Sequence, residues 1–303
     1  MQISELDCVG VLGASGLVGT ELITILAEQG VNQITVDVNA NAPLWFLAIP
    51  DQASLEITPT LLQRGATVID LSAAHRDDAT VPLVVPSLNG NLLDASPSLI
   101  ASPNCTATIL AIAVAPLLPL GLTSITVTTM QAISGAGSDA LDLLEQQTRA
   151  SLEGKSNHAA DEWAFNVICH ESAINADSGM SGEEQKVIDE TRRLLDLPSI
   201  TIMPTCLRVP VRRTHVESIV VQCDEQIDEQ KIREAFDSAP GIRVLDDRDQ
   251  STFPSSHSAD GRDTVDVGHI RVDGHAISFL AAGDQLRVGA ALNAVEIARR
   301  LPG

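Results

Sequence analysis

The stretch Cys8–Leu26 reads CVGVLGASGLVGTELITIL and joins three kinds of segment. A short apolar run, Cys8–Leu12, leads into the glycine-rich turn Gly13–Gly19, and apolar residues then recur at helical spacing over Thr20–Leu26. Strand, glycine turn and helix in this order are typical of dinucleotide-binding folds, because glycines let the backbone approach a pyrophosphate, whose charge rests on the helix N-terminal amides. The glycine spacing is G-x-x-G-x-x-G rather than G-x-G-x-x-G, so a glycine turn without a ligand stays an open alternative.

The next hundred residues predict a largely parallel sheet, because short apolar runs alternate with polar or helical segments. These runs are Ile34–Val38, Leu44–Ile49, Thr67–Leu71, Leu83–Val85 and Leu99–Ala101. A helix is expected over Thr58–Arg64. Only Asn39–Pro43 separates the second strand from the third, whereas a parallel crossover usually needs about a dozen residues. The two runs therefore form a hairpin, or the fold has lost an element here.

Composition and charge limit the classes of function. The 303 residues suffice for two domains, and aromatic residues make up only 2%, so the core must rest on Leu, Val, Ile and Ala. A formal net charge of −21 argues against partners such as nucleic acid or anionic membranes. The N-terminus shows no signal peptide, and the longest apolar run, residues 109–122, contains two prolines, so we expect a cytoplasmic protein.

Five cysteines are scattered along the chain and form no C-x-x-C pair, which argues against disulfides and a zinc site. One of them, Cys105, follows a predicted strand and opens an apolar helix. Backbone amides and the helix dipole stabilise a thiolate at a helix N-terminus, so this is a suitable place for a nucleophile. A buried structural cysteine is an equally good interpretation from position alone.

The region after Thr123 predicts a second set of strands and helices. Strands are expected at Ser124–Met130, Thr205–Val211, Val216–Cys223, His269–Val272 and Ala276–Ala281, with helices near Asp139–Thr148, Glu183–Leu195, Gln230–Ala239 and Arg287–Arg300. A glycine loop is expected at Gln131–Gly137 and a polar loop at Asp246–Asp263.

The densest basic cluster, Leu207–His215, covers the end of the expected strand Thr205–Val211 and the connection Arg212–His215 to the next strand. It is a candidate anion site, and His215 within it a candidate proton carrier. A solvated strand edge is the alternative for the cluster, and a structural role is the alternative for any one of the seven histidines.

Six blocks, in order along nearly the whole chain, resemble the aspartate-semialdehyde dehydrogenase family. They are Gly13–Gly19, Ser102–Thr106, Gln131–Gly137, Gly182–Lys186, Cys206–His215 and Arg287–Val295. The resemblance implies an α/β fold with two parts. A shortened Rossmann-like domain, residues 1–104, is completed by the C-terminal helix 285–303, and residues 105–284 form an α/β catalytic and dimerisation domain with a mixed sheet. It also implies a homodimer or homotetramer.

The resemblance further implies the reductive dephosphorylation of L-4-aspartyl phosphate by NADPH through a thioester on Cys105, in the synthesis of lysine, threonine, methionine and isoleucine. Catalytic residues would be Cys105, His215 as acid/base and Gln131 as the residue that orients the acyl group. The substrate would be bound by Arg208, Glu183, Lys186, Arg76 and Asn104. The cofactor would be bound by Gly13, Ser15, Gly16, Leu17, Val18, Ser72, Ser134, Gly135 and Asn293, and no metal is implied.

One departure from the family concerns the cofactor. The family normally carries several tens more residues after the second strand, including a loop that grips the 2′-phosphate of NADP. In this chain Asp37 stands near the end of that strand, where an acidic residue can bind a ribose 2′-hydroxyl and indicate NAD, and an ordinary aspartate at a strand end is an equally good interpretation. Two other hypotheses stay open: an N-acetyl-γ-glutamyl-phosphate reductase, whose cysteine usually lies in Pro-Gly-Cys-Tyr, and a catalytically silent paralogue with a binding or regulatory role.

Overall fold

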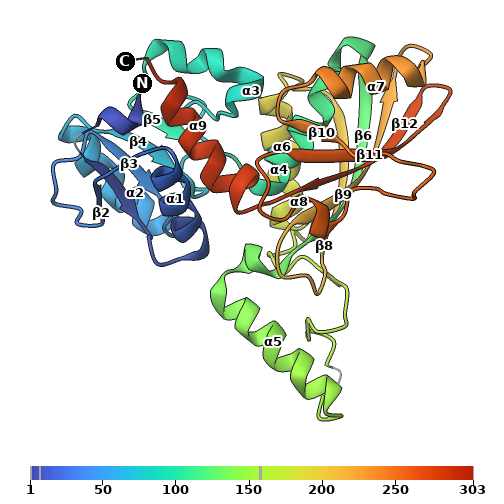
Figure 1. Ribbon diagram of the computed structural model, residues 1–303, viewed down its shortest axis with the longest axis horizontal. Coiled ribbons are helices and arrows are strands. Elements are labelled where there is room, and N and C mark those ends of the chain that lie inside the picture. The colour runs from blue at the N-terminus through green and yellow to red at the C-terminus, as the bar shows by residue number, and fades with distance from the viewer. Residues whose placement is uncertain (1, 7, 157–158, 303) are drawn as a thin grey trace.

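The computed structural model describes residues 2–6, 8–156 and 159–302, which form two lobes with a projecting arm (Figure 1). The first lobe is built on a five-stranded sheet whose order is β2-β1-β3-β4-β5 and whose recorded pairs are all parallel. Its strands are β1 (Val9–Leu12), β2 (Ile34–Thr35), β3 (Leu44–Leu47), β4 (Thr67–Asp70) and β5 (Leu99–Ala101). The predicted strand at Leu83–Val85 is only an isolated bridge, from Leu83 to Ala101.

Helices cover both faces of this sheet, as in doubly wound folds. The helix α1 (Leu17–Glu28) shares one apolar core with the C-terminal helix α9 (Leu292–Arg300), whereas α2 (Asp51–Gln63) packs on the opposite face. The predicted helix 58–64 is therefore the second half of a longer one. Both ends of the chain lie at the first lobe (Figure 1).

The short connection after β2 does not make a hairpin, so that expectation is wrong. Both β2 and β3 pair in parallel with β1, on its opposite sides, and Val9 is the partner of Ile34 on one side and of Leu44 on the other. Residues 36–43 cross from one side of β1 to the other without forming a helix. The parallel crossing without a helix is compatible with the alternative, a fold that has lost an element here.

The glycine turn between β1 and α1 is fixed by close backbone contacts. Gly13 has φ +84°, and a Cβ there would lie 2.0 Å from the carbonyl oxygen of Ala48. A Cβ on Gly19 would lie 2.0 Å from the carbonyl oxygen of Gly13. No other residue type fits at these two positions without movement of the backbone.

The second lobe is built on a mixed sheet of seven strands in the order β10-β11-β12-β9-β6-β8-β7. Its strands are β6 (Leu122–Gln131), β7 (Ile168–Cys169), β8 (Thr201–Arg208), β9 (His215–Cys223), β10 (Ile242–Val244), β11 (Val265–Asp273) and β12 (Ala276–Gly283). The sequence did not predict the short edge strands β7 and β10. One face of the sheet packs in the main core with α4 (Cys105–Val114), α6 (Gly182–Leu194) and α7 (Glu229–Ser238).

The opposite face of this sheet carries exposed or partly exposed side chains. Thr126 on β6 pairs in register with Met203 on β8, and both are exposed. The arm helix α5 (Ser138–Leu152) projects away from both lobes (Figure 1) and exposes Leu143 and Leu152. The remaining helical segments are η1 (Ile3–Glu5), α3 (Pro86–Asn89), η2 (Gly90–Ala95), η3 (Ala115–Leu120), η4 (Ile133–Ala136) and α8 (Ser256–Ala259).

The predicted closing helix 287–300 begins with a π-helical turn, η5 (Arg287–Ala291), before α9. This turn runs against α4, and a Cβ on Gly289 would lie 2.6 Å from the Cβ of Cys105. The glycine and the wider turn together bring the C-terminal segment against the start of α4, between the two lobes.

Candidate active site

Cys105 is the first residue of α4, directly after β5 and the turn 102–104. The residue before it, Asn104, caps the helix, and its Oδ1 accepts hydrogen bonds from the backbone N–H groups of Thr106 at 2.9 Å and Ala107 at 3.1 Å. Cys105 is partly exposed and lines a cavity of about 160 Å³ between the two lobes. The structure therefore places this thiol in a cleft.

His215, at the start of β9, faces the same sulfur. Its Nε2 lies 3.5 Å from Cys105 Sγ, and its Nδ1 accepts a hydrogen bond from the backbone N–H of Ala132 at 3.1 Å. A neutral imidazole that accepts at Nδ1 carries its proton on Nε2, so the proton points at the sulfur. Burial, and then the positive charges of Arg208 and His170, hold the pKa of His215 well below its usual value. The ring is thus a neutral donor towards Cys105.

Gln131 and Glu183 bring β6 and α6 to the same point. The Nε2 of Gln131 donates to Thr106 Oγ1 at 2.8 Å and to Glu183 Oε1 at 2.9 Å, and Asn104 Nδ2 donates to the same carboxylate oxygen at 3.1 Å. Burial alone would raise the pKa of Glu183, but His170 and the hydrogen bonds from Gln131 and Asn104 lower it below its usual value. Glu183 is therefore a buried, ionised carboxylate beside the thiol.

This carboxylate reverses one expectation from the sequence. Burial, followed by the negative charge of Glu183, raises the pKa of Cys105 to about 11, although Arg208, Thr106 and Arg76 act in the opposite direction. The helix N-terminus does not keep the sulfur ionised at neutral pH in this arrangement, and the group is a thiol.

The cationic side chains lie around this centre at different depths. Arg208, at the end of β8, is 4% exposed, and its Nη1 donates to the carbonyl oxygen of Ala132 at 3.1 Å. Arg76 lines the cavity, and its Nε donates to the carbonyl oxygen of Ser102 at 2.9 Å. Lys186 lies about one turn beyond Glu183 on α6 and is exposed, outside the side chains that line the cavity.

The predicted cofactor residues divide into two groups. Val18, Ser134 and Gly135 line the cavity with Cys105, and the turn Gly13–Leu17 leads directly to Val18 at the start of α1. A Cβ on Gly16, the residue before α1, would meet only the carbonyl oxygen of Gly13, at 3.5 Å, so the approach to the helix N-terminus is open.

Two further predicted cofactor residues are held in structural hydrogen bonds. The Oγ of Ser72 donates to Asp70 Oδ2 at 2.9 Å. The Nδ2 of Asn293 donates to the carbonyl oxygen of Val84 at 3.0 Å and to Ser102 Oγ at 2.9 Å. Neither side chain is among those that line the cavity.

Sequence reasoning missed three residues of the site. His170 is close enough to shift the pKa of both Glu183 and His215. Glu171 pairs with Arg208, and Glu190 accepts a hydrogen bond from the backbone N–H of Asn104 at 2.5 Å. Glu190 lies seven residues after Glu183, on the same face of α6, and this spacing was a signal that could have found it.

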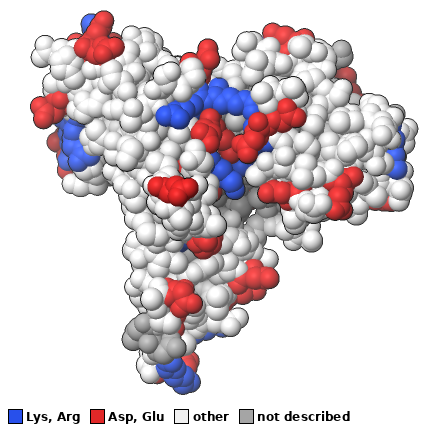
Figure 2. All heavy atoms as spheres, turned by 180° about the vertical axis from the view of Figure 1, so that it is seen from behind, with Lys and Arg blue, Asp and Glu red and all other residues white. Residues whose placement is uncertain are grey.

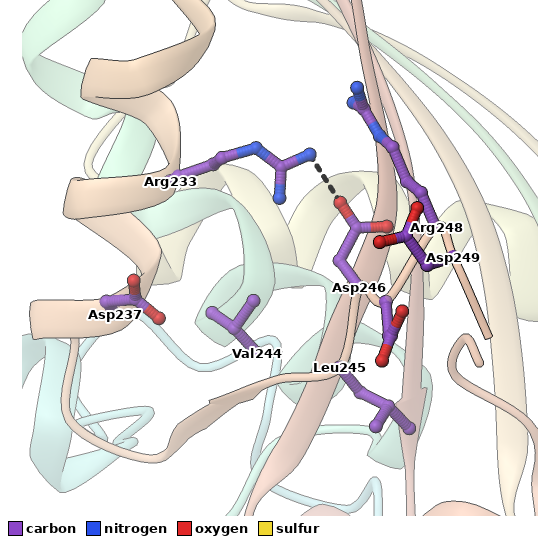
Figure 3. Close-up of a pocket in the computed structure, with 8 residues that line it drawn as sticks. Arg233, Asp237, Val244, Leu245, Asp246, Arg248 and Asp249 are labelled. Atoms are coloured by element: carbon purple, nitrogen blue, oxygen red, sulfur yellow. Dashed lines mark ion pairs between the residues drawn. The ribbon is translucent and has the colours of Figure 1, made fainter. Parts of the chain in front are cut away.

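A roomier cavity, of about 620 Å³, lies elsewhere, beside α7 and the segment that follows β10 (Figure 3). It is lined by Arg233, Asp237 and Val244–Asp249, and an ion pair of 2.6 Å joins Arg233 to Asp246. These lining residues include neither a cysteine nor a histidine. The chemistry therefore belongs to the smaller cavity at Cys105.

Three further observations concern the surface, the helices and metal binding. On the face shown in Figure 2, basic side chains gather between the two lobes and acidic side chains surround them. Within residues 2–6, 8–156 and 159–302, none of the helices is long and apolar enough to cross a bilayer. Among the same residues, no group of three or more His, Cys, Asp or Glu side chains is placed to hold a metal ion.

Comparisons with known proteins agree with this geometry. The family described as "Semialdehyde dehydrogenase, NAD binding domain" matches residues 29–96, and "Semialdehyde dehydrogenase, dimerisation domain" matches residues 114–288. The aspartate-semialdehyde dehydrogenase of Prochlorococcus marinus is 34% identical, over 96% of this chain and 94% of its own. That of Aquifex aeolicus is 37% identical, over 82% of this chain and 76% of its own.

A solved structure extends the likeness to the fold. Aspartate semialdehyde dehydrogenase II from Vibrio cholerae, complexed with ASA, has a TM-score of 0.90 and 30% identity, and the match covers 97% of both chains. The chain therefore belongs to the aspartate-semialdehyde dehydrogenase family of oxidoreductases.

Proposed function

We propose that this chain catalyses the NADP-dependent reductive dephosphorylation of L-4-aspartyl phosphate to L-aspartate 4-semialdehyde, in the synthesis of lysine, threonine, methionine and isoleucine. The observation that carries the proposal is the pairing of Cys105 with His215 at 3.5 Å, in a cleft that also holds Arg76 and Asn104. The similar Vibrio cholerae enzyme, named for aspartate semialdehyde and solved with ASA, supports the choice of substrate.

In this proposal the sulfur of Cys105 attacks the acyl carbon of the acyl phosphate. A C–S bond replaces the C–O bond to phosphate, which gives the thioester, and the thiol proton leaves on the released phosphate. Arg76, Lys186 and Asn104 stabilise the charge of the leaving phosphate. Gln131 is fixed by Thr106 and Glu183 and orients the acyl group. When the aldehyde leaves, the sulfur departs as a thiolate, and the Nε2–H of His215 points at it and stabilises its charge by a hydrogen bond. As the acid/base residue, a His215 ring that has first taken up a proton from water would pass that proton to the sulfur and return to the neutral form.

Glu183 favours the aspartyl substrate over the N-acetyl-γ-glutamyl alternative. An ionised, buried carboxylate pairs well with the free ammonium group of an aspartyl substrate, whereas an acetylated amine is neutral and would leave the charge of Glu183 uncompensated. The bidentate geometry of arginine suits Arg208 to the α-carboxylate of the same substrate.

The turn before α1 fits a dinucleotide. Gly13 and Gly19 allow the tight backbone, Gly16 leaves the approach open, and the first amides of α1 face it without a side-chain cap. Ser15, Leu17 and Val18 would complete the contacts, with Ser134 and Gly135 from the cavity at Cys105. Ser72 and Asn293, which lie outside the lining of that cavity, would contribute only after their hydrogen bonds rearrange. The cofactor, when bound, supplies the hydride that reduces the thioester.

NAD is the second candidate cofactor, because the chain has no Lys or Arg before Arg64 and Asp37 lies two residues after the end of β2. Asp37 would repel a 2′-phosphate, and the cation nearest to it in the chain is Arg64, whose Nη1 is already bound to the carbonyl oxygen of Val38 at 2.6 Å. Fluorescence titration with NADPH and NADH, on the parent and on Asp37→Ser, separates the two cofactors. Tight binding of NADPH by the parent supports NADP, and a gain of NADPH affinity in the variant supports NAD. A silent paralogue would bind neither.

We propose a homodimer or homotetramer in the cytoplasm, with residues 1–104 and 285–303 as the cofactor domain and residues 105–284 as the catalytic and dimerisation domain. The match to a dimerisation domain and the exposed sheet face at Thr126 and Met203 support a second copy of the chain as the partner. Light scattering of Met203→Asp is the test, and a mass unchanged from that of the parent would exclude this face.

The activity is tested with Cys105→Ala. We expect loss of the phosphate-dependent oxidation of aspartate semialdehyde with an unchanged melting temperature. Cys169→Ala, which changes an exposed free cysteine, is the matched control and should keep full activity. Undiminished turnover of Cys105→Ala would contradict the thioester route.

A further inference from the structure

Arg208 is already bound to a carboxylate of the chain itself. Its Nε donates to Glu171 Oε2 at 2.9 Å and its Nη2 donates to Glu171 Oε1 at 2.7 Å. Two parallel hydrogen bonds of this kind are the arrangement in which an arginine grips the carboxylate of a small molecule. The third nitrogen, Nη1, donates to the carbonyl oxygen of Ala132. All three nitrogens of the guanidinium therefore have partners.

The two members of the pair differ in exposure. The side chain of Arg208 is 4% exposed, whereas that of Glu171 is 41% exposed. The guanidinium is part of the buried site, and the glutamate reaches it from the rim. Glu171 can turn into water at low energetic cost, but Arg208 has no such option.

The backbone around Glu171 is anchored on both sides. The N–H of His170 donates to the carbonyl oxygen of Cys206 at 2.9 Å, and the Oγ of Ser172 accepts from the N–H of Glu183 at 3.0 Å. The loop is thus tied to β8 and to the start of α6. Release of Arg208 needs only a rotation of the Glu171 side chain and no movement of the loop.

Glu171 is fully charged at physiological pH. Burial alone would raise its pKa, but the hydrogen bonds and the charge of Arg208 lower it to about 2. A second carboxylate placed against Arg208 would meet this negative charge and that of the ionised Glu183 close by. Two carboxylates that share one guanidinium repel each other, so one of them is expected to leave.

We propose that Glu171 is an internal competitor for the substrate carboxylate: it holds Arg208 in a bidentate pair and must rotate away before the α-carboxylate of the substrate can bind there. This rests on the proposed function, in which Arg208 binds that carboxylate. The pair compensates the buried guanidinium while no substrate is bound, and it lowers the apparent affinity for substrate by the free energy needed to break it. Glu171 is then a determinant of KM, and the chemical step does not depend on it.

The test compares Glu171→Ala and Glu171→Gln with the parent enzyme. We expect the KM for aspartate semialdehyde to fall by about three- to thirtyfold in Glu171→Ala, less in Glu171→Gln, with kcat changed little, since a partly exposed charge-assisted pair contributes on that scale. Glu234→Ala, an exposed glutamate on α7, is the matched control and should leave KM unchanged.

A binding measurement keeps the test independent of turnover. Calorimetric titration with L-homoserine, which has the α-carboxylate and the ammonium group, should show the same gain in affinity for Glu171→Ala. An amino alcohol that lacks the carboxylate should show no gain.

Weaker binding of L-homoserine by Glu171→Ala would mean that Glu171 positions Arg208 and does not compete, and unchanged binding would mean that it does neither; both results overturn the inference while the proposed function stands. If the parent itself neither binds L-homoserine nor oxidises aspartate semialdehyde, the proposed function fails, and this inference with it.

Discussion

Neutralisation of Glu183 should make Cys105 more reactive. Both side chains contact Thr106 Oγ1: Cys105 Sγ lies 4.0 Å from it and Glu183 Oε1 lies 3.4 Å from it. The distance between the sulfur and this carboxylate oxygen therefore cannot exceed the sum of these two distances. At a separation of about 7 Å and an effective dielectric constant of about 20, a negative unit charge destabilises the thiolate by about 2 kcal/mol, which raises its pKa by between one and two units. Glu183→Gln should therefore lower the pKa of Cys105 from about 11 by roughly that amount.

The change appears as a faster alkylation. Well below the pKa, the thiolate fraction rises about tenfold for each unit, but a less basic thiolate is also a weaker nucleophile, so the net gain at pH 8 is about three- to twelvefold. The assay is iodoacetamide labelling with mass spectrometry of the peptide that contains Cys105. The glutamine can still accept the hydrogen bonds from Asn104 and Gln131.

Asp189→Asn, an exposed residue on the same helix, is the control and should leave the labelling rate unchanged. A Glu183→Gln variant that reacts at the parental rate, or more slowly, would refute the assignment of the raised pKa to this carboxylate.

Three other outcomes follow from the structure. His215→Asn should lower kcat by about a hundredfold or more with little change in KM, measured by steady-state kinetics, and an unaffected rate would remove His215 from proton transfer. Glu217 is fully buried, neither of its carboxylate oxygens has a hydrogen-bond partner among the described residues, and burial raises its pKa well above its usual value. The folded state then holds this proton more tightly than the unfolded chain does, so stability is full below about pH 4.5 and is lost as the pH rises towards the folded pKa. The difference between the melting temperatures at pH 5 and pH 8 should be smaller in Glu217→Gln than in the parent. An equal dependence of the melting temperature on pH in both proteins would contradict this. Glu190→Ala should lower the free energy of unfolding in urea by about 2–4 kcal/mol, because the N–H of Asn104 and Arg76 lose their carboxylate; a loss close to zero would show that water replaces it.

The sequence predicted the two-part α/β fold because its signals are local. The turn at Gly13 needs a residue that tolerates a positive φ and the close approach of Ala48, and glycine meets both requirements. The glycine pattern in the sequence therefore predicts the turn. The connection after β2 was predicted correctly as too short for a helix. Which side of β1 the next strand joins depends on pairing across the sheet, and no local pattern encodes it.

The sequence predicted only those residues of the site that the start of a helix or the resemblance to a family indicates. The approach of Cys105 to His215 joins residues 110 positions apart, and the structure was needed to show it. The sequence led us to expect an ionised Cys105, because a helix N-terminus is visible in sequence. The burial of the sulfur and the nearby charge of Glu183, which raise the pKa, are not visible there. Glu171 was missed because it follows a two-residue strand without periodic signal.

Glu21 fastens the two lobes together at a single carboxylate. This residue of α1 binds Arg213 at 2.8 Å through one oxygen and Arg287 at 2.7 Å through the other. Arg213 lies two residues before His215, and Glu21 lies two residues after the end of the glycine turn. The Glu21–Arg213 ion pair therefore links α1 to β9, the strand that begins with His215. A hinge at this junction would have to break the Glu21–Arg213 ion pair, and we expect the dinucleotide turn and the imidazole to keep their spacing while the outer parts of the lobes move.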